Sequence, residues 1–316
     1  MTGQAAPSHA GSARVKPQRR RLPVETVVFA SLALVTLVVL GLGLPLPLPS
    51  LTVQVVLLGV LVGILGLPHG ALDPLIARRA GLWRTPLGFA GFNMAYILVV
   101  VGVVLLWLIA PVASLVTFLL VSALHFGSDW NADRAPWLRF LAGFGLLSVP
   151  ALSHPAQVSA AYVVLAGDGG AVVASVQEWL GPLALASLLL AALVALRHRA
   201  HESIEILLAT MLALATEPLV FFLLYFCALH SFRHLKAGFQ AERDGGRLSA
   251  LVVMVYTVVP ILIVGVVLVW LGPDGSLSEQ ILQVVFIGLA GLTVPHMIVV
   301  TCENRHRRAL RAPDLC

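Results

Sequence analysis

The 316-residue chain is 59 % hydrophobic and only 11 % charged, whereas soluble domains carry about 25 % charged residues. Its net charge of +5 does not indicate nucleic-acid binding, because the basic residues stand in short clusters between apolar runs. The three cysteines lack metal-type spacing, so we expect neither a disulfide framework nor a cysteine metal site.

Residues 1–22 are rich in Ser, Ala and Arg and predict a disordered tail rather than a cleavable signal peptide. Long uncharged apolar runs follow, and runs of about 18 residues or more predict transmembrane helices. The predicted fold is therefore all-α, a polytopic transmembrane helix bundle with about ten segments (8–10). The segments are 24–44, 51–67, 88–110, 111–127, 136–152, 180–197, 203–216, 218–235, 248–271 and 281–301.

Two stretches fit this division least well. Segment 203–216 is short and contains Glu205. Residues 155–170 are only mildly apolar and end in Gly-Asp-Gly-Gly, so they lie along the outer surface or re-enter the membrane. We see no separate soluble domain. The chain divides into a cytoplasmic tail (1–22), a transmembrane catalytic domain (23–302) and a basic cytoplasmic tail (303–316).

The positions of the basic residues support ten segments. With the N-terminal tail in the cytoplasm, all 20 Lys and Arg residues fall on the cytoplasmic side and none in the outer loops. The positive-inside rule predicts this asymmetry. A different segment count would move every later cluster to the other side, so we expect a multi-pass protein of the cell membrane with both termini in the cytoplasm.

Five histidines then share one membrane depth, close to the cytoplasmic side. Ionisable residues inside a membrane are rare and usually functional. His230 and His234 lie four residues apart, on one face of a helix, where two imidazoles reach one metal. The candidate metal ligands are these five histidines, His69, His125, His230, His234 and His296.

Two acids follow histidines by one helical turn. Asp73 lies four residues after His69, and Asp129 lies four residues after His125. A carboxylate there can hold the ring nitrogen that faces away from a metal. A turn at Asp73, before Pro74, or a hydrated helix end at Asp129 explains the same spacing. Arg233, between two predicted ligands, pairs with one of these acids or extends to the lipid headgroups, and we favour the second.

An all-imidazole site suits iron, copper, zinc or nickel, and the residues alone do not select among them. Histidines at one depth also fit a metal or proton transporter, or a haem protein. A membrane di-iron enzyme of the desaturase or hydroxylase type is a further alternative, although such enzymes show more histidine boxes than the one HxxxH found here.

Four motifs resemble the Brp/Blh-type β-carotene 15,15′-dioxygenases, which are membrane proteins found alongside microbial rhodopsins. The motifs are LPHGALD at 67–73, ALHFG at 123–127, EPLVFFLLYFCALHSFRH at 217–234 and VPHM at 294–297. They occur in the family's order over about three-quarters of the chain. The Pro-His-Gly and His-Ser-Phe-Arg-His elements are the more specific ones.

The resemblance implies oxygen-dependent cleavage of the central double bond of β-carotene to two retinal molecules at Fe²⁺. It also implies that His69, His125, His230 and His234 hold the iron, with His296 as a possible fifth ligand. β-Carotene and O2 would be the substrates, the first taken from the lipid bilayer, and a retinal-binding rhodopsin would be a functional partner. A polyene needs an apolar lining. Aromatic residues at suitable depth are Phe92, Tyr96, Phe126, Trp130, Phe226 and Phe232.

Overall fold

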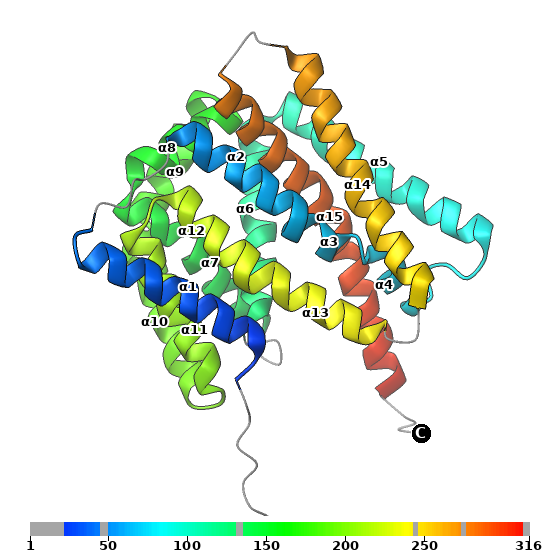
Figure 1. Cartoon of the computed structure of the whole chain (residues 1–316), viewed down its shortest axis with the longest axis horizontal. Helices are drawn as coiled ribbons and strands as arrows, with labels where there is room; N and C mark the ends of the chain where they lie inside the picture. Colours follow the sequence, from blue (N-terminus) through cyan, green and yellow to red (C-terminus); the bar gives the residue numbers. More distant parts are fainter. Residues whose placement is uncertain (1–21, 45–49, 131–134, 243–245, 273–275, 312–316) are drawn as a thin grey trace, which may run out of the picture.

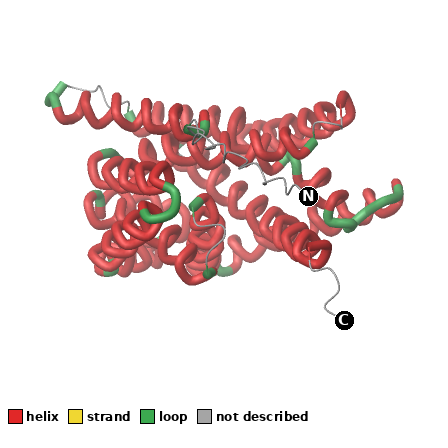
Figure 2. Tube along the Cα trace, turned by 90° about the horizontal axis from the view of Figure 1, so that it is seen from below, coloured by secondary structure: helices red, strands yellow, loops and turns green. Residues whose placement is uncertain are grey.

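The computed structural model of the chain describes residues 22–44, 50–130, 135–242, 246–272 and 276–311. Within these ranges every regular element is helical and there is no strand. Figure 2 shows helix along almost the whole described trace. A helix satisfies its own backbone hydrogen bonds, as a segment surrounded by lipid requires. The predicted all-α class is therefore confirmed.

Proline sets the start of many of these helices. Its ring fixes φ, and its missing N–H costs nothing in the first helical turn. The helices that begin at a proline are α5 (Pro86–Ile109), α6 (Pro111–Phe126), α7 (Pro136–Ser153), α8 (Pro155–Ala166) and α12 (Pro218–Tyr225).

Six described helical stretches are long and apolar enough to cross a membrane, and a bent pair would be a seventh. The pair is α9 (Asp168–Trp179) and α10 (Gly181–Leu196), which meet at 54°. The six are α1 (Val24–Gly41), α5, α6 with its continuation to Asp129, the stretch Pro218–Ala241, α14 (Gly246–Leu271) and α15 (Leu277–Arg311). The described chain is thus that of a helical membrane protein.

Three predicted segments are not among these stretches, namely 51–67, 136–152 and 203–216. They form α2 (Leu51–Leu61) with the π-helical turn η1 (Val62–Gly66), α7, and α11 (Ala200–Ala215). Helices α7 and α11 pack on α10 and on each other, so they need not be apolar on every side. The count of ten spans stays a prediction.

The helices differ in how much of their surface they bury. In α5 and α14 only 6 % of the membrane-length window is buried, whereas the stretch Pro218–Ala241 is 50 % buried. Figure 1 shows α5 and α14 at one side of the molecule, and α12 and α13 (Phe232–Ala241) passing through its middle. The element that carries His230 and His234 is therefore central, and α5 and α14 face the lipid.

Glycine allows α6 and α7 to approach closely beside the histidines. A Cβ on Gly143 would lie 1.8 Å from the carbonyl oxygen of Ala123, and one on Gly127 would lie 1.8 Å from that of Arg139. Small residues permit such approach between membrane helices. The contact fixes the single 3₁₀ turn η2 (Gly127–Asp129), which ends in Asp129.

Two π-helical turns face each other next to the histidines. Turn η1 precedes α3 (Leu67–Gly70), which carries His69, and turn η3 (Phe226–Ser231) contains His230. A Cβ on Gly66 would lie 2.7 Å from Cε1 of Phe226, so the two turns pack tightly. Such turns occur often at functional sites, and the sequence spacing did not predict them.

Residues 155–170 form α8 and the first residues of α9, two helices that pack on the bundle. Helices α8 and α9 are joined at Gly167, whose φ of +63° suits glycine, and both contact α7. Trp107 of α5 donates a hydrogen bond to the carbonyl of Leu165 at 2.8 Å. Of the two predicted tails, residues 1–21 and 312–316 lie outside the described residues, and residues 303–311 continue α15.

Candidate metal centre

Four histidine rings converge at the centre of the protein. The ring centroid of His125, at the end of α6, lies 4.6 Å from that of His230 and 5.8 Å from that of His234. It lies 5.2 Å from that of His296, which α15 supplies. The rings of His230 and His234 are 4.6 Å apart. Three helical stretches, α6, Pro218–Ala241 and α15, thus bring together four of the five predicted ligands.

The fifth histidine, His69, lies in α3, and its side chain is outside the described part of the structure. Its helix packs on α13, α14 and α15, two of which carry histidines of the cluster. The fold thus places the backbone of His69 next to the helices of His234 and His296.

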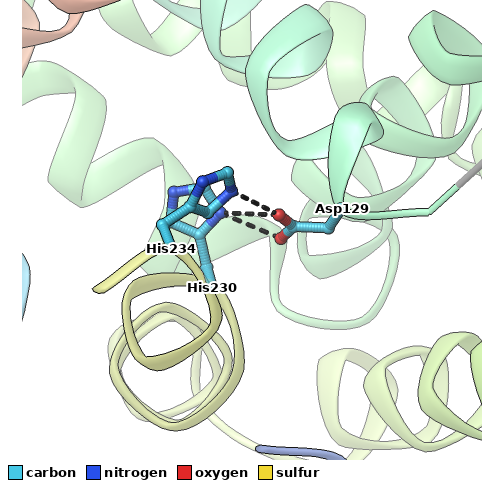
Figure 3. A group of neighbouring side chains, drawn as sticks. All are labelled: Asp129, His230 and His234. Atoms are coloured by element: carbon cyan, nitrogen blue, oxygen red, sulfur yellow. Dashed lines mark hydrogen bonds and ion pairs between the residues drawn. The ribbon is translucent and has the colours of Figure 1, made fainter. Parts of the chain in front are cut away.

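Asp129 holds two of the histidines (Figure 3). Nδ1 of His230 donates to its carboxylate oxygens at 2.9 and 3.1 Å, and Nε2 of His234 donates at 3.0 Å. The hydroxyl of Tyr225 donates to the same carboxylate at 2.5 Å. The carboxylate of Asp129 is fully buried, so these donors replace the water that it loses.

Asp73 plays the corresponding part for His296. Nδ1 of His296 lies 2.6 Å from Oδ1 of Asp73, and the hydroxyl of Tyr96 donates to Oδ2 at 2.8 Å. Asp73 begins α4 (Asp73–Arg79), next to α3. The sequence spacing predicted that each acid bonds the histidine four residues before it. In the described contacts each acid instead bonds a histidine of another helix, because helix packing decides which groups meet.

Behind Asp129 lies an ion pair, not predicted from the sequence, between the largely buried Arg233 and the fully buried Glu205. Arg233 donates to both carboxylate oxygens of Glu205, at 2.7 and 2.8 Å, and to the backbone carbonyl of Asp129 at 2.9 Å. Trp130 and Thr26 also donate to Glu205, at 2.9 and 2.5 Å. The interpretation that Arg233 extends to the headgroups is therefore wrong. Glu205, an acid inside an apolar segment, is the feature of the sequence that points to this pair. By itself it argued only against a membrane span at 203–216.

The predicted aromatic residues fall into two groups. Phe126 and Phe226 lie against the cluster, with centroids 4.8 and 5.5 Å from that of His230, and Phe226 is stacked on it. Trp130 instead lies behind the site on Glu205. Tyr96 is linked to the site through its hydrogen bond to Asp73, and the ring centroid of Phe92 lies 5.9 Å from that of Tyr96. Phe232 is half-buried at the start of α13.

The donors present fit a metal ion. One ligand atom from each of Asp129, His230 and His234 lies within 4.8 Å of the others. Carboxylates hold Nδ1 of His230 and of His296, an arrangement that directs Nε2 toward a metal. Imidazole nitrogens with carboxylate support suit iron, zinc, copper or nickel. A cavity of about 160 Å³ lies beside this group, and His234, His296, Arg79, Glu303 and Arg307 are among the residues that line it.

The fold and this centre together define a helical membrane protein with a buried histidine–carboxylate site of metal-binding type. Comparison with known proteins agrees. The family model for β-carotene 15,15′-dioxygenase matches residues 60–302, which include all five histidines and both acids. The chain belongs to this family of carotenoid-cleaving dioxygenases.

Two curated relatives cover most of the chain. A β-carotene 15,15′-dioxygenase from uncultured marine bacterium 66A03 is 30 % identical over 248 residues, 76 % of this chain and 90 % of the relative. A probable β-carotene 15,15′-dioxygenase Blh from Halobacterium salinarum is 27 % identical over 284 residues, 77 % of this chain and 82 % of the relative. No solved structure matches the chain.

Proposed function

We propose that this protein cleaves the central 15,15′ double bond of β-carotene with dioxygen and releases two molecules of retinal. The observation that carries the proposal is the convergence of His125, His230, His234 and His296, two of them bonded through Nδ1 to buried carboxylates. The family match and the names of both relatives support the same reaction.

The reaction needs no other redox partner. One carbon–carbon double bond and the oxygen–oxygen bond break, and two aldehyde C=O bonds form. We propose Fe²⁺ as the cofactor, held by His69, His125, His230 and His234, with His296 as a fifth ligand or as part of the pocket wall. When bound, ferrous iron supplies the activation of dioxygen.

The protein's own residues contribute orientation and exclusion of water. Asp129 and Asp73 fix the ring orientation of His230 and His296. Phe126 and Phe226, both nearly fully buried, make the surroundings of His230 apolar, as a polyene requires. Helices α5 and α14 expose most of their surface to lipid, in which β-carotene dissolves. We therefore propose that the substrate enters from lipid.

We further propose the orientation that the basic residues predict, with ten spans, both termini in the cytoplasm, and the metal near the cytoplasmic side of the cell membrane. Figure 1 supports it, because the start of α1 and the end of α15 lie on the same side of the molecule. Retinal is the chromophore of rhodopsins, so a rhodopsin is the functional partner we propose.

The test is expression in a β-carotene-accumulating bacterium, followed by chromatography of the pigments and measurement of protein-bound iron. We expect loss of β-carotene and appearance of retinal, in a ratio of one to two. The matched control is His154→Ala. His154 lies outside the cluster, bonded to Ser153, and this variant should retain full activity. Intact β-carotene alongside folded, iron-loaded protein would contradict the proposal and favour a di-iron enzyme or a transporter.

A further inference from the structure

The cavity beside the histidines has charged side chains in its walls. Helices α4, α13 and α15 line it, with the buried His296, the partly exposed His234, and the charged residues Arg79, Glu303 and Arg307. Figure 1 shows α13 and the last turns of α15 approaching each other at the lower right, next to α4. Its volume of about 160 Å³ exceeds the roughly 10–15 Å³ that one water molecule needs. The cavity is therefore wide enough to admit water or an ion to two proposed ligands.

An ion-pair cluster lies in one wall of the cavity. The guanidinium of Arg79 bonds Glu242, at the end of α13, and lies 3.1 Å from Glu303 of α15. Arg307 pairs with Glu303 at 2.8 Å. The side chains of Arg79, Glu242 and Glu303 are 27 %, 15 % and 12 % exposed, whereas that of His234 is 34 % exposed, so the cavity is open to water beside the cluster. Among the described ion pairs, those of Arg79 join α4 to the end of α13 and to α15.

A divalent cation cannot reach the site through the lipid-facing helices, because a charge in the bilayer interior costs several kcal/mol. A second described cavity, between α6, α7 and α9, is lined almost entirely by apolar side chains. The cavity beside Arg79 has charged groups in its walls and reaches two imidazoles. We propose that it is the route by which the metal ion reaches the histidines from the aqueous phase. This inference rests on the proposed function.

The experiment measures rates of metal exchange, not activity. The protein is stripped of metal in lipid nanodiscs, and Co²⁺ uptake and its release to a chelator are followed by the Co²⁺ absorption bands. Ala237→Phe and Val300→Phe place bulk in the passage from opposite walls. Each should slow uptake and release together by about tenfold or more, while Kd changes by less than about twofold. Ala186→Phe, on an exposed face of α10, is the control and should change neither rate.

Unchanged rates in both filled variants, with normal Co²⁺ stoichiometry, would overturn the route while leaving the metal site intact. A changed Kd at unchanged rates would also overturn it. Absence of Co²⁺ binding in the unaltered protein would instead remove the proposed function together with the route.

Discussion

Removal of Arg233 tests whether the buried ion pair positions the site as well as stabilising the fold. Arg233→Met leaves Glu205 charged and buried, with only Trp130 and Thr26 as donors. Removing one partner of a buried pair costs about 3–5 kcal/mol. Because two donors remain, we expect the free energy of unfolding to fall by about 3 kcal/mol.

The double variant separates the two roles. In Glu205→Gln with Arg233→Met both charges are gone, and the amide oxygen can still accept the bond from Trp130. We expect it to regain about 2 kcal/mol of the lost stability, the size of coupling found for residues in one network. The carbonyl of Asp129 has no guanidinium donor in either variant. Metal affinity should therefore fall about 10–100-fold in both, the usual effect of losing a group that orients a ligand.

The assays are denaturant unfolding in detergent and competition for bound metal against a chelator of known affinity. Arg199→Met is the matched control, because Arg199 pairs with Glu202 on the same α11 but is half exposed. It should cost less than about 1 kcal/mol and leave metal affinity unchanged. Recovery of metal affinity together with stability in the double variant would refute the positioning role. Stability and affinity of the Arg233→Met protein equal to those of the unaltered chain would refute the whole argument.

The remaining predictions concern the groups that touch the histidines directly. His230→Ala and His234→Ala should each abolish both retinal formation and bound iron, and full activity in either would remove that residue from the site. Asp73→Asn should leave the protein folded but speed its loss of metal about 10–100-fold through His296, and unchanged retention would reduce Asp73 to a residue of the helix start. Tyr225→Phe removes a donor to the Asp129 carboxylate and should lower the free energy of unfolding by about 1.5–3 kcal/mol. Denaturant titration measures this change, and an unaltered unfolding midpoint would contradict the importance of that hydrogen bond.

The sequence by itself determined the class of protein. Uninterrupted apolar runs specify helices, because no other local structure satisfies the backbone in lipid. Prolines stand at the first positions of α5, α6 and α12, where their fixed φ favours a helix start. The one-sided distribution of basic residues predicted that five histidines share one depth, and in the structure four of their rings lie close together.

The tertiary structure decided which groups meet. Asp129 bonds His230 and His234, about a hundred residues away, and Asp73 bonds His296, more than two hundred residues away. The pairing of Glu205 with Arg233 joins α11 to α13 in the same way. Periodicity within one helix reports the face on which a side chain lies. The partner on the opposite face depends on how helices pack, and that packing is set by glycine contacts and π-helical turns that no local spacing encodes.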